Sequence, residues 1–427
     1  MCCQKSKIFE IYGCDLLNAA EGTGIEKECI KPLKAEKVHS ITKSKVQEDV
    51  LHCDQNSKFV VLSISIEPIL SLAERFNLSP QETIFKISGY FKEKGVHAVH
   101  TTTIAEEFAL LETTSEFIYR YTNKKNGFRS SLPMLASACP GWICYAEKTH
   151  GFLLPFISTT KSPQQIMGSL LKLYYAKEKN IEPGNIYHIS LMPCYDKKLE
   201  ASRADFYNAD LNVKDVDCVI TAVEVELLLQ KEVINFCEIK SQSLNYFKDL
   251  DITLQEHLSV HFESLAGVYA YYIAINAAKE LFHIDIRNTQ LKSIEKNQDL
   301  KEIIFQNDDK TLNFAVINGF RNIQNMIQKI KRNKCSYDYV EIMACPSGCI
   351  NGSAQIKSRE GSSSKELILK LESLYSQLPK RITTDRISAN KLFKDWLNRN
   401  FKCNVEAILH TSYHVVPKNV FPLNIKW

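Results

Sequence analysis

Three short stretches of the sequence share one unusual context. The first reads Ala136-Ser137-Ala138-Cys139-Pro140-Gly141-Trp142 and the second Met192-Pro193-Cys194-Tyr195-Asp196-Lys197-Lys198. The third reads Met343-Ala344-Cys345-Pro346-Ser347-Gly348-Cys349. Each stretch follows directly on an apolar run that is typical of a buried β-strand. In each one, a cysteine stands beside proline or glycine at the position where a strand should end and a loop begin.

The apolar, β-branched runs that predict strands recur along the chain after residue 58. They lie at residues 59–64, 97–101, 134–137, 186–191, 218–220, 313–317 and 339–343. Helical patterns stand between them. One starts at Ser162-Pro163, a capping serine with proline in the first turn, and another covers residues 322–331. Strands that alternate with helices predict an α/β fold with largely parallel sheets.

Composition and charge narrow the class of protein. The 427 residues carry a net charge of +4, which argues against nucleic acid as the main partner. No apolar run reaches the eighteen or so residues that a membrane span requires, and the N-terminus has no stretch resembling a signal peptide. We therefore expect a cytosolic or nuclear protein. In a reducing compartment its 14 cysteines should be buried side chains, metal ligands or reactive thiols.

Four of these cysteines, Cys139, Cys194, Cys345 and Cys349, follow predicted strands. Ligands of open α/β sheets bind outside the carboxyl ends of the strands, so the four thiols are expected to meet in one crevice. Four converging thiolates are what a [4Fe–4S] cluster requires. The residues alone leave two alternatives open, a tetrahedral zinc site and ordinary core cysteines.

The three stretches resemble, in order, the cluster motifs of iron-only hydrogenases. Longer matches over residues 135–151, 162–170, 192–203 and 319–325 resemble more closely the eukaryotic hydrogenase-like proteins of cytosolic iron–sulfur cluster assembly, the nuclear prelamin A recognition factor-like family. The resemblance runs from Phe59 to Trp427. It implies a two-lobed hydrogenase-like domain with parallel or mixed sheets, in which Cys139, Cys194, Cys345 and Cys349 bind one [4Fe–4S] cluster.

The same resemblance argues against hydrogenase activity and implies no catalytic residue. Hydrogenases place a proton-relaying cysteine directly before the Cys-Pro-Gly-Trp ligand, and this chain has Ala138 there. A methyl group cannot exchange a proton. Lys197 matches the lysine that would hold a diiron-site ligand, so part of that pocket is retained. Glu200 is interpreted as a helix-surface or salt-bridged carboxylate in preference to a proton-path residue.

The N-terminal segment departs from the family. Glu28-Cys29-Ile30-Lys31-Pro32 matches the first part of a second cluster motif, which makes Cys29 the ligand position there. The Cys-x-x-Cys-x-x-Cys run that should follow is absent, so the resemblance does not imply a working second cluster. Three explanations stay open: a segment missing from this isoform, a lost cluster, or new ligands drawn from Cys2, Cys3, Cys14, Cys29 and Cys53.

The resemblance implies a non-enzymatic factor that helps pass [4Fe–4S] clusters from the cytosolic scaffold to the targeting complex and to apo iron–sulfur proteins. The C-terminal Trp427, with its free carboxylate, is a candidate docking point for that complex. A nuclear prelamin-binding protein on the same scaffold is one alternative. A redox or hydrogen-converting enzyme is the other.

The predicted organisation has four parts. A degenerate ferredoxin-like iron–sulfur segment covers residues 1–57, and a first hydrogenase-like lobe covers residues 58–185. A second lobe follows over residues 186–380. Residues 381–427 form a C-terminal helix and tail.

Overall fold

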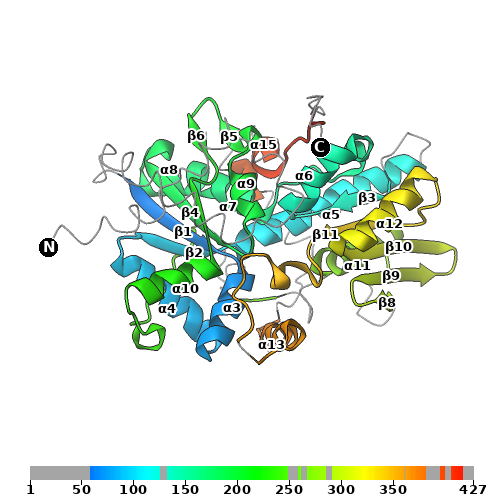
Figure 1. Ribbon diagram of the computed structural model, residues 1–427. Helices are drawn as coiled ribbons and strands as arrows, with labels where there is room; N and C mark the ends of the chain where they lie inside the picture. Colours follow the sequence, from blue (N-terminus) through cyan, green and yellow to red (C-terminus); the bar gives the residue numbers. More distant parts are fainter. Residues whose placement is uncertain are drawn as a thin grey trace, which may run out of the picture.

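The computed structural model describes residues 58–125, 132–248, 258–260, 267–284, 291–359, 361–380, 395–399 and 405–416. Two β-sheets dominate these residues (Figure 1). The expected α/β class and the parallel and mixed sheets are confirmed. Every one of the seven predicted strands is present, and that at Phe59–Ile64 matches its predicted bounds.

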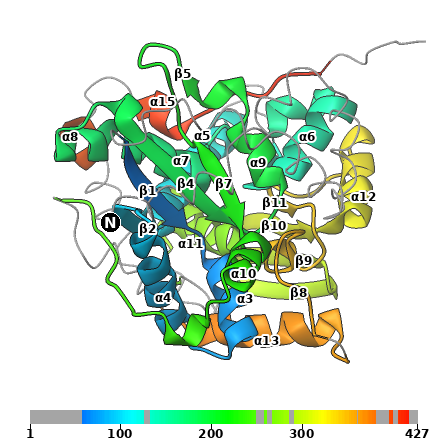
Figure 2. The ribbon, with the colours of Figure 1, turned by 60° about the vertical axis from the view of Figure 1, so that its left-hand side comes forward.

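The first sheet has four parallel strands in the order β2-β1-β4-β7. Val, Ile and Leu make up almost half of these strands, and nearly every position is buried, as in parallel strands covered on both faces. One face packs against α3, α4, α10 and α13, and the other against α5, α7 and the π-helix that continues α7. Figure 2 shows helices on both sides of this sheet. The strands are β1 (Phe59–Ile64), β2 (Ala98–Thr101), β4 (Ile186–Met192) and β7 (Cys218–Thr221).

The second sheet has five strands in the order β3-β11-β10-β9-β8. The first three are parallel, whereas β9 and β8 are joined antiparallel to them. Helix α11 packs on one face, and α6 and α12 pack on the other. The strands are β3 (Met134–Ala136), β8 (Leu291–Asn297), β9 (Leu300–Asn307), β10 (Lys310–Asn318) and β11 (Tyr339–Met343). A two-stranded hairpin, β5 (Tyr207–Asn208) and β6 (Val213–Lys214), lies apart from both sheets.

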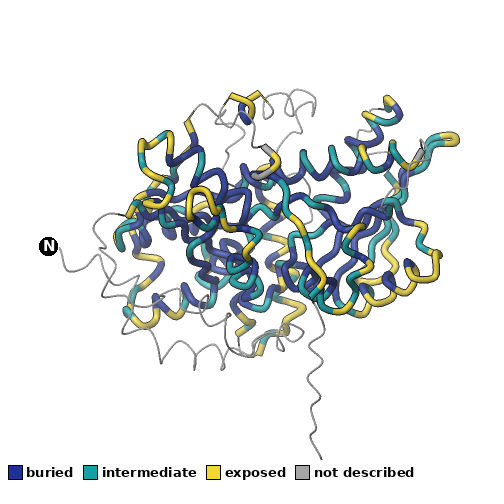
Figure 3. Tube along the Cα trace, turned by 90° about the horizontal axis from the view of Figure 1, so that it is seen from above, coloured by how far each residue is buried: buried dark blue, intermediate teal, exposed yellow. Residues whose placement is uncertain are grey.

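The long helix α5 (Thr103–Lys125) connects the two sheets. Its first half, around Phe108, belongs to the core of the first sheet, and its second half, around Phe117, belongs to the core of the second. Buried residues consequently continue from one sheet to the other (Figure 3). Each sheet also draws strands from both sides of the boundary expected after residue 185, so the sheets interleave along the chain.

The remaining helices cover these sheets. They are α3 (Ile66–Phe76), α4 (Pro80–Glu93), α6 (Pro140–Thr149), α7 (Pro163–Ser169), α8 (Ala176–Lys179), α9 (Asp196–Ala201), α10 (Ala222–Lys231), α11 (Val268–Phe282), α12 (Gly319–Lys331), α13 (Ser364–Ser376) and α15 (Val405–Leu409). Helix α7 begins at Pro163 as predicted, but the Ser162 hydroxyl makes no capping bond and donates to Glu200 instead. No helix in the described part of the chain is long and apolar enough to cross a membrane.

Candidate metal centre

Cys139 lies where β3 ends and α6 begins. Its amide donates to the Ser137 hydroxyl (3.0 Å), and that hydroxyl donates to the Ile342 carbonyl of β11 (2.6 Å). Pro140 takes the first helical position, where its missing N–H costs nothing. A Cβ on Gly141 would lie 2.7 Å from Asp196 Oδ2, so the glycine lets α6 approach α9 closely. The Cys-Pro-Gly sequence thus fixes the thiol at the carboxyl end of the second sheet.

Cys194 comes from the other sheet, two residues after β4. It is 9% exposed and precedes α9. The loop that carries it is bonded to the segment after Cys349, since Ala354 donates its N–H to the Pro193 carbonyl (3.2 Å). A Cβ on Gly352 would lie 2.3 Å from that same carbonyl oxygen. The glycine therefore permits contact between the loops of the two sheets.

Cys345 and Cys349 lie on one tight turn after β11. Ser347 and Gly348 both adopt the left-handed region, with φ of 61° and 74°. The Ser347 amide donates to Asp299 Oδ1 (2.6 Å), which holds the turn against the second sheet. A Cβ on Gly348 would lie 3.0 Å from Met343 Sδ. The chain reverses here, so both thiols come to the same end of the sheet.

The four thiols converge at the junction of the sheets. Burial raises the pKa of Cys349, and negative charge on Glu67 and on the other three thiols raises it further. Burial also raises the pKa of Cys345 to about 12 and that of Cys194 well above its ordinary value. Backbone amides of Ala344 and Trp142 donate to the Cys139 sulfur and moderate the same effect there. All six pairs of thiols are thus close enough to influence one another electrostatically.

The donor set fits an iron–sulfur cluster chemically. It provides four cysteine sulfurs, on two buried and two half-buried residues, with backbone N–H groups directed at sulfur. Within the described residues, no three His, Cys, Asp or Glu side chains are grouped in the manner of a single-ion site.

Lys197 and Glu200 form a buried ion pair beside the thiols. Lys197 Nζ lies 2.9 Å from Glu200 Oε2, and Gln165 donates to the same carboxylate (3.1 Å). Burial lowers the pKa of Lys197, but the charges of Glu200 and of the nearby thiols outweigh it, and the pKa is raised overall. Glu200 is therefore a salt-bridged carboxylate, as expected, although it is buried and not on the helix surface.

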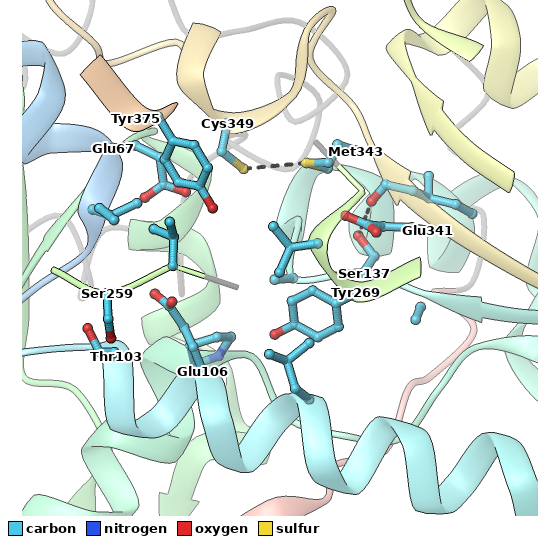
Figure 4. Close-up of a pocket in the computed structure, with 18 residues that line it drawn as sticks. Glu67, Thr103, Glu106, Ser137, Ser259, Tyr269, Glu341, Met343, Cys349 and Tyr375 are labelled. Atoms are coloured by element: carbon cyan, nitrogen blue, oxygen red, sulfur yellow. Dashed lines mark hydrogen bonds between the residues drawn. The ribbon is translucent and has the colours of Figure 1, made fainter. Parts of the chain in front are cut away.

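A cavity of about 140 Å³ adjoins Cys349 and Ala138. Figure 4 shows the Glu106 carboxylate and the Tyr269 hydroxyl directed into it, with the Cys349 thiol 3.9 Å from Met343 Sδ at its wall. Among the described residues that line it there is no basic side chain. Burial raises the pKa of Glu341 to about 7, against the opposing effect of the backbone amides that it accepts from.

The sequence interpretation missed these carboxylates. Glu341 gave a signal, because it is the single charged residue in the apolar strand Tyr339–Met343. It accepts the N–H groups of Ala270 (2.9 Å) and Gly267 (3.3 Å) at the start of α11. Glu67 gave no comparable signal. Cys29 and Trp427, and the other N-terminal cysteines, lie outside the described residues.

Comparison with known proteins agrees with this arrangement. Residues 58–353 match the iron only hydrogenase large subunit, C-terminal domain. The cytosolic Fe-S cluster assembly factor narfl of Xenopus tropicalis is 45% identical over 407 residues, which cover 95% of this chain and 84% of the relative. The chain belongs to this hydrogenase-like family.

A mouse relative, named cytosolic iron-sulfur assembly component 3, is 44% identical over 87% of this chain and 77% of its own length. Among solved structures, the apo form of a variant of the [FeFe]-hydrogenase HydA1 from Chlamydomonas reinhardtii superposes with a TM-score of 0.71 at 25% identity. The match covers 85% of this chain and 96% of that one. The expected hydrogenase-like fold is confirmed. In the family member described here, both sheets contribute cysteines to the junction.

Proposed function

We propose that this protein is a non-enzymatic factor of cytosolic iron–sulfur cluster assembly that binds one [4Fe–4S] cluster through Cys139, Cys194, Cys345 and Cys349. The observation that carries the proposal is the convergence of four buried or half-buried thiols from two sheets on one point, in a chain whose relatives are named for this process. When bound, the cluster would supply an exchangeable or structural iron–sulfur unit. The protein's residues supply the sulfur ligands, the amide donors and the exclusion of water.

The absence of enzymatic turnover is supported by the cavity beside Cys349. Ala138 lines it where a proton-relaying thiol would be required, and Lys197, which could hold a diiron-site ligand, is bound to Glu200 at 2.9 Å. We expect no hydrogen evolution from the reconstituted protein with a reduced viologen dye. Turnover above the rate of the dye with free cluster would contradict a purely non-enzymatic role.

In the cell, the partners are expected to be the cytosolic scaffold, the targeting complex and apo iron–sulfur proteins. The cytosol is the location that the names of the relatives give for those proteins. Trp427 is proposed as the contact with the targeting complex. Deleting Trp427 alone should abolish co-purification of that complex and leave the iron content unchanged.

The cluster itself is tested by iron, zinc and acid-labile sulfide analysis after anaerobic reconstitution, with EPR of the reduced protein. We expect about four iron per chain, lost in Cys345→Ser and retained in Cys237→Ser, an exposed thiol far along the chain from the other four. Zinc in place of iron and sulfide would overturn the assignment. About eight iron, half of it lost in Cys29→Ala, would show a second cluster at the N-terminus.

A further inference from the structure

One element of the molecule carries an excess of positive charge with no acidic residue to balance it. Residues 319–334, which form α12 and the turn after it, contain five Lys and Arg residues and no Asp or Glu, while the whole chain has a net charge of +4. The cations are Arg321, Lys329, Lys331, Arg332 and Lys334, and all five are exposed. The rest of the protein is therefore close to neutral, and among the helices that the structure describes α12 has the largest net charge.

Helix stability does not account for this charge. Cations in the last turn favour the negative end of the helix dipole, which explains Lys329 and Lys331. Arg321, however, stands in the first turn, where the dipole disfavours it and no acidic residue is present. Lys329 and Lys331 lie over the rings of Tyr337 and Phe152, and the nearby Glu302 is bonded to Tyr337 (2.7 Å) and Lys296 (3.3 Å).

A groove of about 390 Å³ runs between α12 and the second sheet. Its floor is apolar and is formed by Leu300, Ile317 and Met326. Ile317 and Met326 are only 1% and 2% exposed and fix the base of the floor, whereas the half-buried Leu300 offers most of the apolar surface that a partner can touch. Figure 1 places α12 on the outside of the five-stranded sheet, where a partner can reach it.

The rim of the groove carries the charge. Lys329, Arg332 and Lys334 all line it, together with uncharged Asn and Gln side chains. Three cations around an apolar floor match a segment that has carboxylates on either side of one apolar side chain. If the cations served only to keep a helix face in contact with water, no apolar floor would be needed between them.

The other classes of anionic partner fit less well. The apolar face of α12, which includes Ile323, Ile327 and Ile330, is buried in the core of the second sheet, so the helix cannot insert into a bilayer. Nucleic acid would bring phosphates to the rim, but its backbone offers no apolar group for the floor. We infer that the groove between α12 and the second sheet is a docking site for an acidic protein segment with an apolar anchor residue.

The groove lies close to the turn that carries Cys345 and Cys349, so docking there would bring a partner near the proposed cluster. The α-carbon of Gly319, at the start of α12, faces Pro346 in the turn between Cys345 and Cys349. The 13 residues of α12 span about 20 Å, so a partner in the groove would lie within that distance of the cluster turn. The role of docking near a cluster rests on the proposed function, whereas the docking itself does not require a bound cluster.

The probe for the test is a short fluorescent peptide of glutamates around one central leucine, titrated with the full chain. We expect binding that weakens with added salt and falls about tenfold in the triple variant Lys329→Gln, Arg332→Gln, Lys334→Gln. The matched control is Lys231→Gln, Lys240→Gln, Lys292→Gln, which removes three exposed cations elsewhere and should bind like the wild type. Replacing the leucine of the peptide by alanine should cost a further factor of about ten.

Three results would overturn the inference. Equal loss in the control triple would mean diffuse attraction by overall charge, and equal binding of the alanine peptide would mean that the apolar floor is not used. Tighter binding of a DNA duplex, lost in the groove triple, would assign the surface to nucleic acid. Iron content measured on the same samples tests the proposed cluster separately. Failure of the docking inference would therefore be distinguishable from failure of the proposed function.

Discussion

The two sheets contribute unequally to the proposed metal centre and are stabilised differently. The parallel sheet supplies one thiol, Cys194, whereas the mixed sheet supplies Cys139, Cys345 and Cys349. The parallel sheet contains a buried polar network: Ser63 Oγ lies 2.7 Å from His188 Nε2, and His188 Nδ1 lies 2.8 Å from the Asp215 carbonyl oxygen. The mixed sheet has aromatic packing at the corresponding depth, with the rings of Phe117 and Phe314 5.0 Å apart.

This difference separates two sources of stability. The centre of the parallel sheet is stabilised by buried hydrogen bonds that depend on whether His188 is protonated. The loops of the mixed sheet carry one buried thiol, Cys139, and two half-buried ones, Cys345 and Cys349, which are costly to hold as charged thiolates there unless iron shares the charge. A bound cluster would therefore offset the charge of three thiolates on the mixed sheet. It would also link that sheet to the parallel sheet through the single ligand Cys194.

The largest effect is expected from removing that single ligand. Cys194→Ala should abolish the cluster, because three thiols on one sheet leave one iron corner without a protein ligand. Iron and sulfide per chain should fall from about four to near zero. The control is Cys218→Ala, a cysteine of the same sheet that is also buried but does not stand at the carboxyl end of its strand. A Cys194→Ala protein with full iron content would show that the mixed sheet binds the metal alone.

The polar network predicts how the parallel sheet responds to acid. Burial lowers the pKa of His188 from 6.5 to about 4, so the unfolded chain binds a proton that the native protein does not. The resulting stability is complete above pH 6.5 and is lost as the pH falls through 4, by at most about 3 kcal/mol. Denaturant unfolding from pH 7 to pH 4 should show this slope in the wild type and a shallower one in His188→Gln. Identical slopes would remove His188 from the explanation.

Glu341 of the mixed sheet should make stability depend on pH in the opposite direction to His188. Burial raises its pKa from 4.5 to about 7, so the native protein holds a proton that the unfolded chain has released. Its contribution is complete below pH 4.5 and is lost as the pH rises through 7. Between pH 5 and pH 8, the free energy of unfolding of the wild type should fall relative to that of Glu341→Gln by up to about 3 kcal/mol, measured by denaturant unfolding. A constant difference across that range would argue that Glu341 is already ionised at pH 5.

Much of this comparison was predictable from the sequence. The strands at 59–64 and 339–343 were predicted to the residue because parallel buried strands are continuous apolar runs bounded by loop residues. The convergence of the thiols followed from their places after strands. Strands β8 and β9 were missed for different reasons. Strand β8 is polar and largely exposed, whereas the apolar run of β9, Ile303-Ile304-Phe305, is too short to predict a strand by itself. The interleaving of the sheets depends on strand order, which local patterns do not encode.

The cavity could not be predicted from the sequence, for a different physical reason. Glu67 and Tyr269 stand near the starts of different helices, α3 and α11, and only the way the two sheets pack together brings both to the cavity beside Cys349. The role of Ser162 was misjudged because a serine before proline ordinarily caps a helix. Here the Ser162 hydroxyl donates a hydrogen bond to the buried Glu200 carboxylate instead.

The smallest predicted effect tests the contact between the sheets directly. In Gly352→Ala the new methyl group would lie 2.3 Å from the Pro193 carbonyl oxygen and 3.1 Å from that of Cys349, so the two cysteine-bearing loops must separate. We expect a loss of about 2 kcal/mol in the free energy of unfolding and a faster loss of iron to a chelator. Gly361→Ala is the matched control, because its Cβ meets nothing within 4 Å. Its φ of 85° should cost about 1 kcal/mol without touching the metal centre. If both variants lose iron at the wild-type rate, the close approach of the loops at Gly352 does not protect the cluster, and the sheets are held together chiefly by α5.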